Sequence, residues 1–218
     1  FFGAEVTEVD GNIADCGKIA NQLAAENGWF DVSTLKEPYR LEGKKTMGYE
    51  IAEQLGWDVP DVILYPTGGG TGIIGIWKAF GELEKLGWTG AKRPRMVAVQ
   101  SDSCNGIFTA FHQKEIRSTY MDKGFTVANG LRVPKPYADK VILQVLRDSN
   151  GYSVSVTDEE ILVSLHELAS REGLFVAPEG AALWHAFKTL SGNGFISDGE
   201  TILLLNTGSA YKYLDNIK

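Results

Sequence analysis

The chain has 218 residues, 44% hydrophobic and 22% charged, which is enough to bury the core of one large domain or of one and a half smaller ones. Its formal net charge of -7, with both signs interspersed, argues against nucleic acid or an anionic membrane as a partner, because both require a basic face. No apolar run approaches the length that spans a bilayer, and no signal-peptide pattern opens the sequence. Cys16 and Cys104 stand in no metal-ligand spacing, so we expect a cytoplasmic protein with two unpaired thiols and no metal site.

The N-terminal part of the chain predicts short elements. Residues 4–9 predict a strand, and residues 13–27 carry apolar side chains at a helical spacing that Gly28 ends. Residues 29–32 predict a second short strand, and residues 35–43 a connection between two layers or two domains. Because the chain begins within a predicted strand, without a cap, a linker or an initiating methionine, we expect it to lack its beginning.

The rest of the chain alternates between helices and strands. The strands are predicted at residues 62–65, 96–99, 141–145, 174–177 and 201–205. Helices are predicted at residues 44–55, 73–86 and 181–190, and another follows the polar turn at 100–103 and runs through residue 111. A further helix begins at a capping box of Thr157 and Glu160 and runs to residue 171. Residues 122–139 predict a loop. Apolar strands between helices favour an α/β fold with a mostly parallel open sheet and helices on both faces. Ligands bind beyond the carboxyl ends of such strands, which directs attention to residues 67–72, 100–105, 178–180 and 206–209.

A glycine-rich turn lies between the predicted strand at 62–65 and the helix at 73–86. Its sequence is Tyr65-Pro66-Thr67-Gly68-Gly69-Gly70-Thr71-Gly72. Such a turn exposes several backbone N–H groups at a helix N-terminus, where the macrodipole also favours negative charge. Glycine permits a phosphate oxygen to approach the backbone and allows positive φ. The alternative is a tight turn without a ligand, but four glycines and two threonines favour a phosphate site.

Three phosphate-binding schemes compete for this turn. A Walker A loop would require a lysine followed by serine or threonine after the last glycine, and Ile73 and Ile74 stand there instead. The spacing of Gly70, Gly72 and Gly75 matches a dinucleotide fingerprint, for which Asp102 is a distant candidate ribose ligand, so this signal is weak. The third scheme is a cofactor with a single terminal phosphate.

Four segments together resemble the threonine synthase family, whose members are pyridoxal-phosphate enzymes of fold type II, related to tryptophan synthase β. They are residues 66–75 (PTGGGTGIIG), 37–46 (EPYRLEGKKT), 178–182 (PEGAA) and 205–209 (LNTGS). The resemblance covers nearly the whole chain. The glycine segment is specific for the superfamily, and the segments around Arg40 and Pro178 point more narrowly to threonine synthase.

The resemblance implies roles for individual residues. The cofactor phosphate would be held by the backbone N–H groups of Gly68, Gly69, Gly70 and Thr71 and by the hydroxyl groups of Thr67 and Thr71. Thr207 matches the residue whose hydroxyl bonds the pyridine nitrogen, although it could also be a simple turn residue before Gly208. A neutral partner there suits elimination and replacement at the β and γ carbons of a substrate. Glu179 would line the ring pocket, or would only cap the helix that follows it.

Arg40 is the candidate substrate ligand. The motif around Arg40 resembles the one in threonine synthases, and this resemblance implies that Arg40 binds the phosphate of O-phosphohomoserine. A guanidinium suits bidentate phosphate recognition. This sequence has Glu37 where many relatives have asparagine. The alternative is an exposed arginine paired with Glu42 or Glu37.

The family also holds its cofactor as a Schiff base on a lysine in a segment that this chain does not contain, and a Ser-Gly-Asn loop is absent as well. Lys44 and Lys45 lie at a helix start in the matching pattern and are interpreted as solvated charges. No catalytic residue is therefore assigned, and the chain alone is predicted to be inactive. We expect residues 1–35 to be a remnant of the small domain and residues 36–218 to be the large cofactor-binding domain.

The predicted function is conversion of O-phosphohomoserine to threonine and phosphate by γ-elimination and β-addition of water, as the resemblance implies. The partner is then a small amino-acid substrate, and the whole enzyme is expected to be a homodimer. A serine or threonine dehydratase-type lyase, in which Arg40 is structural, is one alternative. A noncatalytic domain that binds a phosphate ligand is the other.

Overall fold

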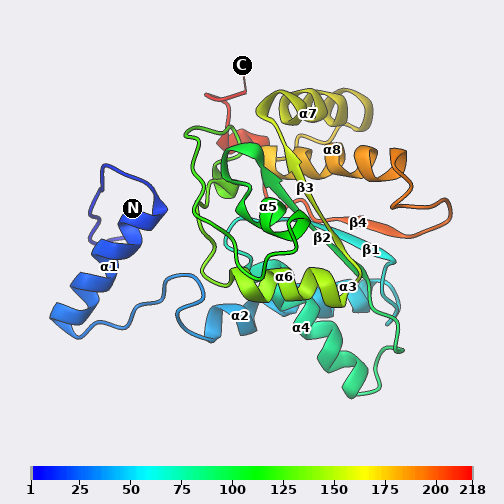
Figure 1. Ribbon diagram of the computed structural model, residues 1–218, viewed down its shortest axis with the longest axis horizontal. Coiled ribbons are helices and arrows are strands. Elements are labelled where there is room, and N and C mark those ends of the chain that lie inside the picture. The colour runs from blue at the N-terminus through cyan, green and yellow to red at the C-terminus, as the bar shows by residue number, and fades with distance from the viewer. Residues whose placement is uncertain (1, 218) are drawn as a thin grey trace.

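The computed structural model describes residues 2–217 as a layered α/β body with one helix set apart from it (Figure 1). The helices are α1 (Ile13–Asn27), α2 (Tyr39–Lys44), α3 (Thr46–Gln54), α4 (Thr71–Lys85), α5 (Gly106–His112), α6 (Asp139–Asp148), α7 (Asp158–Glu172) and α8 (Pro178–Gly192). The strands are β1 (Val62–Pro66), β2 (Arg95–Ser101), β3 (Tyr152–Val156) and β4 (Ile202–Leu204), and short 3-10 helices lie at η1 (Asp102–Cys104), η2 (Asn129–Leu131) and η3 (Ala210–Lys212). No helix within residues 2–217 is long and apolar enough to cross a bilayer.

The four strands form one parallel sheet in the order β3-β2-β1-β4. Val62 pairs with Arg95 on one side and with Ile202 on the other, so β1 lies inside the sheet between β2 and β4. All five residues of β1 are buried, as expected for a strand covered on both faces. The carboxyl ends of the strands therefore meet at one edge of the sheet, which is where the turn after β1 lies.

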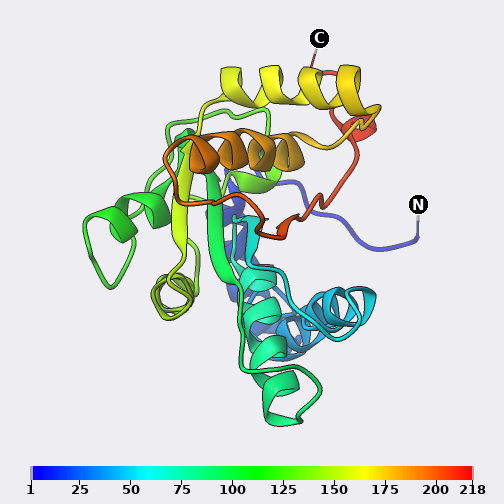
Figure 2. The ribbon, with the colours of Figure 1, turned by 90° about the vertical axis from the view of Figure 1, so that its right-hand side faces the viewer.

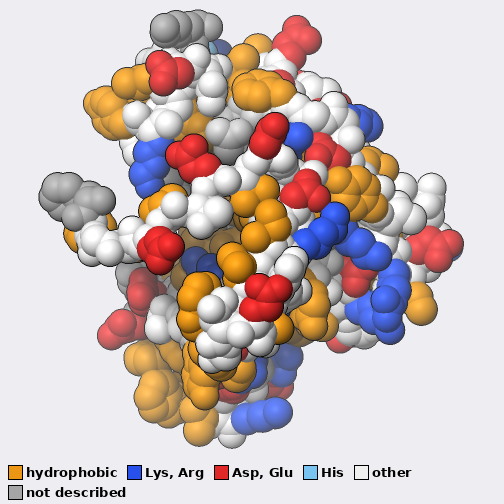
Figure 3. All heavy atoms as spheres, turned by 90° about the vertical axis from the view of Figure 1, so that its left-hand side faces the viewer, with side chains coloured by type: hydrophobic (Ala, Val, Ile, Leu, Met, Phe, Trp, Pro, Cys, Tyr) orange, Lys and Arg blue, Asp and Glu red, His pale blue; other side chains and the backbone are white. Residues whose placement is uncertain are grey.

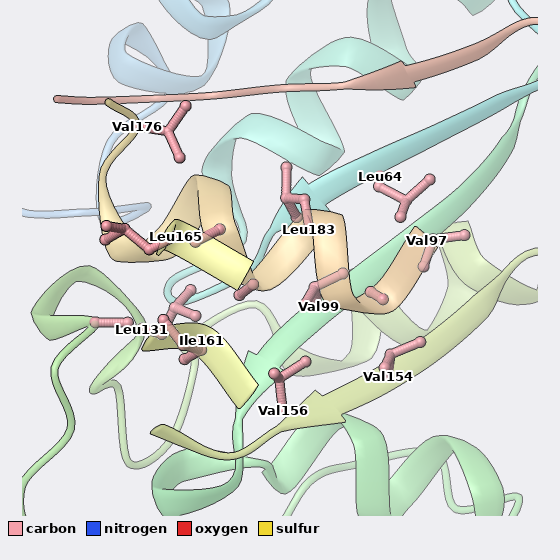
Figure 4. Packing of buried hydrophobic residues seen from close by; sticks show 14 of the residues in the cluster. Leu64, Val97, Val99, Leu131, Val154, Val156, Ile161, Leu165, Val176 and Leu183 are labelled. Atoms are coloured by element: carbon pink, nitrogen blue, oxygen red, sulfur yellow. The ribbon is translucent and has the colours of Figure 1, made fainter. Parts of the chain in front are cut away.

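Alternate residues of the strands face two separate hydrophobic cores. Leu64 and Val99 belong to the core that α7 and α8 cover, whose packing Figure 4 shows. Ile63 and Met96 belong to the opposite core, which α3, α4, α5 and α6 cover. Figure 2 shows α7 and α8 on one side of the sheet and α3 and α4 on the other. The predicted fold class, an open parallel sheet with helices on both faces, is confirmed.

The prediction of a strand at residues 141–145 is wrong, because these residues lie within α6. Ile142, Leu143, Val145 and Leu146 are buried, and this spacing places them on one face of a helix. A short apolar run does not by itself distinguish a strand from a buried helical face. The true strand, β3, was missed, since its alternation of tyrosine or valine with serine is weakly apolar.

Other differences concern the ends of elements and their connections. Residues 4–9 and 29–32 form no strand, and the predicted strand at 174–177 is reduced to one antiparallel bridge between Val176 and Ser209. The predicted connection at residues 35–43 contains most of α2, and the predicted helix at 44–55 is divided between the end of α2 and α3. Helix α1, the glycine that ends it, and the capping box of α7 were predicted correctly.

Helix α1 stands apart from the layered body, and none of its residues 13–27 is buried (Figure 1). Its N-cap, Asn12, donates hydrogen bonds of 3.2 Å to Tyr120 Oη and to Asp122 Oδ2. Figure 3 views the molecule from this side, where hydrophobic, basic and acidic side chains are interspersed. The domain boundary at residue 36 stays a prediction.

Candidate functional site

A cavity of about 740 Å³ brings together most of the residues that the sequence singled out. They are Arg40, Gly68, Gly69, Gly70, Thr71, Glu179 and Thr207. Thr67 is not among the lining residues, because it is fully buried and its hydroxyl donates a 2.9 Å hydrogen bond to Tyr65 O. Its predicted contact with a phosphate stays a prediction, and in this geometry only a lone pair of its hydroxyl oxygen remains for a ligand.

The glycine loop follows β1 and leads into the N-terminus of α4. Gly70 is the N-cap of α4, with φ of 87°, a left-handed conformation that favours glycine. Within residues 2–217 the backbone N–H groups of Gly68, Gly69, Gly70 and Thr71 have no hydrogen-bond acceptor. Four free donors at the start of a 15-residue helix are suited to an anion, because the helix dipole acts in the same direction. The loop therefore fits the phosphate of pyridoxal phosphate.

Close packing explains two of the glycines. A Cβ atom on Gly68 would lie 2.4 Å from the carbonyl oxygen of Gly130, so the loop is pressed against the 3-10 helix η2. A Cβ atom on Gly72 would lie 1.9 Å from Tyr65 Oη. Burial raises the pKa of that phenol. The loop consequently has space for a ligand only on the cavity side.

Thr207 lies on the same cavity, beyond the carboxyl end of β4. Ala177 N donates a 3.0 Å hydrogen bond to Gly208 O, which ties this segment to the start of α8. A Cβ atom on Gly180 would lie 2.4 Å from Asn206 Oδ1, so the two segments are in close contact. The Thr207 hydroxyl has no hydrogen-bond partner within residues 2–217. It is available to a ligand ring, as the resemblance implies.

Arg40 is exposed on the first turn of α2 and lines the cavity. The predicted alternative, an ion pair with Glu37 or Glu42, does not form among the described residues; Glu42 pairs with Lys45 and Lys78 instead. The Glu37 carboxylate is buried and accepts from the backbone N–H of Arg40 at 3.2 Å. Arg40 Nη1 donates to Val32 O and Thr34 Oγ1, at 3.1 and 3.2 Å. The guanidinium has five N–H donors, so most remain for a ligand.

Glu179 is 5% exposed and lies in the first turn of α8. Its Oε1 accepts hydrogen bonds of 2.8 Å from Gly130 N and from Tyr213 Oη, while no donor within residues 2–217 reaches Oε2. A carboxylate so placed is held by residues far away in the sequence. Glu179 lines the cavity. Its hydrogen bonds go to Gly130 and Tyr213 and not to the N-terminus of its own helix, so it does not cap that helix.

Four lysines add positive charge to the cavity lining. They are Lys36, Lys44, Lys135 and Lys212. Lys36 is paired with Asp31 at 2.9 Å, whereas Lys44, Lys135 and Lys212 form no ion pair within residues 2–217. Lys45, interpreted from the sequence as solvated, is instead half-buried in an ion-pair network with Glu42 and Glu82 that raises its pKa. A lining with this surplus of cations suits an anionic ligand.

Two walls of the cavity were missed from the sequence. One is α1, which contributes Ile13, Ala14, Cys16, Gly17 and Ala20. The other is the predicted loop, through residues 130–137, whose only sequence signal was its content of glycine, proline and lysine. Conversely, Asp102, the candidate ribose ligand after β2, does not line the cavity. Residues 2–217 contain no group of three or more His, Cys, Asp or Glu side chains that could hold a metal ion.

Comparison with known sequences identifies relatives along almost the whole chain. Threonine synthase from Methanocaldococcus jannaschii is 35% identical over 212 residues, which are 97% of this chain and 52% of that protein. Threonine synthase from Methanosarcina acetivorans is 35% identical over 210 residues, which are 96% of this chain and 51% of that protein. The chain thus spans about half the length of the curated relatives it matches.

Solved structures share the fold. A threonine deaminase from T.th. superposes with a TM-score of 0.71 at 22% identity, covering 95% of this chain and 63% of that one. A pyridoxal 5'-phosphate-dependent aspartate racemase superposes with a TM-score of 0.73 at 17% identity, covering 97% and 62%. These structures confirm the predicted fold, and the predicted cofactor, pyridoxal phosphate, is the one that the matching family model names. A family model described as "Pyridoxal-phosphate dependent enzyme" matches residues 1–208. With its glycine loop free to bind a phosphate and its match to this model over nearly its full length, the chain belongs to the family of pyridoxal-phosphate dependent enzymes.

Proposed function

We propose that the chain is the cofactor-binding part of a threonine synthase, which converts O-phosphohomoserine to threonine and phosphate by γ-elimination and β-addition of water. The relatives named threonine synthase, at 35% identity over 96–97% of the chain, support this reaction. Membership of an enzyme family favours it over a noncatalytic phosphate-binding domain. The dehydratase-type lyase is the alternative that an experiment must separate.

One observation carries the proposal: the cavity joins two groups suited to phosphate, the glycine loop and Arg40. The backbone N–H groups of Gly68 to Thr71 would hold the phosphate of the cofactor. Arg40, with most of its donors unused, would hold the phosphate of the substrate. A substrate that lacks a phosphate would leave the guanidinium without this partner.

Bound pyridoxal phosphate would supply an electron-withdrawing ring for bond cleavage at the β and γ carbons of the substrate. The chain's own contribution is to orient and tune that group. The neutral hydroxyl of Thr207 would meet the ring nitrogen and leave it largely unprotonated, and the cavity walls would exclude water. Glu179 would line the ring pocket.

Arg40→Ala tests the assignment of the substrate. In the enzyme with its Schiff-base lysine, we expect kcat/KM for O-phosphohomoserine to fall by at least about tenfold, the loss of one charge-assisted contact. Activity on threonine as a dehydratase substrate should be unaffected. Arg171→Ala, on the exposed side of α7, is the matched control. An equal loss for both substrates would favour the dehydratase-type lyase.

The 218-residue chain alone is predicted to form no productive complex, since it contains no lysine of the family's Schiff-base segment. Borohydride reduction with pyridoxal phosphate, followed by peptide mapping, measures whether a lysine reacts. Lys44 is the position to inspect, because it lines the cavity and forms no ion pair within residues 2–217. An adduct there, together with turnover of O-phosphohomoserine, would contradict the prediction.

We also propose a cytoplasmic location and a homodimer for the whole enzyme. The support for the first is that Cys16 and Cys104 are both free, as in a reducing compartment. The dimer rests on the resemblance to the family. Light scattering coupled to size-exclusion chromatography measures the mass in solution, and a monomer over a wide concentration range would contradict it.

A further inference from the structure

Tyr213 follows η3 near the C-terminus, far along the chain from the glycine loop, and yet both line the same cavity. Its Oη donates a 2.8 Å hydrogen bond to Glu179 Oε1. Burial and this hydrogen bond to a carboxylate raise the pKa of the Tyr213 phenol to about 12. The phenol therefore remains a hydrogen-bond donor throughout the physiological range of pH.

Glu179 passes this contact on to the 3-10 helix η2. The oxygen that accepts from Tyr213 also accepts from Gly130 N at 2.8 Å, so one carboxylate oxygen joins two segments. A Cβ atom on Gly130 would lie 2.8 Å from the same oxygen, which shows that the carboxylate lies directly against the backbone of η2. The Glu179 side chain of α8 is thus in direct contact with Gly130.

Gly130 in turn contacts the glycine loop. Its carbonyl oxygen would lie 2.4 Å from a Cβ atom on Gly68, and Val133 Cγ2 would lie 3.0 Å from it. The first glycine of the loop therefore rests on the segment that Glu179 holds. A continuous series of contacts leads from Tyr213 through Glu179 and Gly130 to Gly68.

The first member of this series is itself firmly placed. Tyr213 N donates a 2.8 Å hydrogen bond to Ala210 O, and Ala210 is fully buried with its N–H bonded to Phe175 O at 3.2 Å. Tyr211, two residues earlier, is 74% exposed and packs only its ring against Phe175. The C-terminal segment thus directs one tyrosine into the cavity and the other away from it.

We propose that Tyr213 and Glu179 are positioning residues for the phosphate-binding glycine loop. They hold η2 against Gly68, and this contact keeps the free N–H groups of the loop converged on one anion. The inference rests on the proposed function, in which that anion is the cofactor phosphate. A purely electrostatic role for Glu179 predicts the opposite result. A carboxylate near an anion site repels the anion, so removal of the carboxylate should then strengthen anion binding.

The test measures the affinity of the protein for inorganic phosphate and for pyridoxal phosphate by calorimetric titration at low salt. We expect Tyr213→Phe to weaken the binding of both by about threefold to tenfold, the loss of one hydrogen bond. Glu179→Ala should weaken it further, and Glu179→Gln less than Glu179→Ala, because the amide oxygen can still accept from Gly130 and Tyr213. Hydrogen exchange of the peptide that covers residues 127–133 should become faster in Tyr213→Phe and Glu179→Ala.

Two matched controls remove the same groups outside the cavity. They are Tyr211→Phe, whose hydroxyl has no partner in residues 2–217, and Glu172→Gln at the exposed end of α7. Neither should change affinity or exchange. If Glu179→Ala does not fold, Tyr213→Phe and Glu179→Gln decide, since both preserve the shape of the side chain.

Tighter phosphate binding by the Glu179 variants would overturn the proposal in favour of a purely electrostatic role. An unchanged affinity and an unchanged exchange rate in Tyr213→Phe would overturn it as well. If the enzyme with its Schiff-base lysine binds neither phosphate nor pyridoxal phosphate, the proposed function fails. The exchange measurement still decides in that case whether Tyr213 and Glu179 hold η2.

Discussion

At the scale of single residues, the glycine loop depends on positions where any side chain would collide. Gly70 combines a left-handed φ of 87° with close packing, because a Cβ atom there would lie 2.2 Å from Ile142 Cδ1. Gly43, in α2, has no atom within 4 Å of its virtual Cβ and no positive φ. The two glycines therefore differ in what limits substitution.

Gly70→Ala should lower the free energy of unfolding by about 1–3 kcal/mol, from left-handed strain and overpacking. It should also weaken phosphate binding, because the N-terminus of α4 must shift. Gly43→Ala is the matched control and should be neutral or stabilising by up to about 1 kcal/mol, since alanine is the better helix former. Urea unfolding of both variants measures the difference. Equal free energies of unfolding for Gly70→Ala and Gly43→Ala would contradict the strain assigned to position 70.

At the scale of elements, a network of ion pairs and hydrogen bonds joins α2, α3 and α4. Glu82 on α4 contacts Lys45 Nζ at 2.7 Å, the Tyr49 hydroxyl at 2.6 Å, and Lys78. Lys45, then Lys78 and Tyr49, lower the pKa of Glu82 to about 2. Because this folded-state pKa lies below the ordinary value of 4.5, the network stabilises the fold above about pH 4.5. That contribution is lost as the pH falls through 2.

Glu82→Gln should therefore lower stability at pH 7 by about 1 kcal/mol or less, the usual value for a partly exposed ion pair. Between pH 4.5 and 2 the variant should lose less stability than the unmodified protein. High salt should reduce the difference between them. Glu50→Gln, at an exposed position of α3 without an ion pair in residues 2–217, is the control. Urea unfolding at several pH values measures these stabilities. The same pH dependence of the free energy of unfolding in Glu82→Gln and in the unmodified protein would contradict the prediction.

At the scale of the whole molecule, residues 2–35 and the layered body differ in packing. The helix α1 buries none of its residues, and Asn12 is one of the contacts that tie it to the body. The same helix nevertheless provides one wall of the cavity. A boundary near residue 36, where a small domain would meet a large one, stays a prediction.

Limited trypsin digestion tests this boundary. Cleavage after Lys18 and Lys36 should precede cleavage within the layered body, because both lysines are exposed beside sparsely packed backbone. The product that begins at residue 37 should keep a cooperative unfolding transition. Mass spectrometry of the time course identifies the first products. Early cleavage within residues 60–205 would contradict the proposed boundary.

The glycine loop and the elements beside it could be predicted from local sequence patterns. Strand β1, the turn and α4 were predicted within two residues of their ends, because apolar periodicity and glycine content act over a few neighbouring residues. The same reasoning failed for α6, where a short apolar run fits both a strand and a helical face. The second wall of the cavity, residues 130–137, has no periodic signal, so its composition indicates a loop but not the cavity that the loop lines.

The amino-acid sequence was sufficient to predict the parallel α/β fold, the exposed N–H groups of the glycine-rich turn, and the family, since each follows from short stretches of residue types. The folded structure was needed to find that Glu37 holds the backbone of Arg40 rather than its guanidinium, and that α1 lines the cavity. It alone brought Tyr213 to Glu179 and Gly130 to Gly68. Contacts between residues so distant in the chain depend on how the helices and the sheet pack, and no local pattern records that packing.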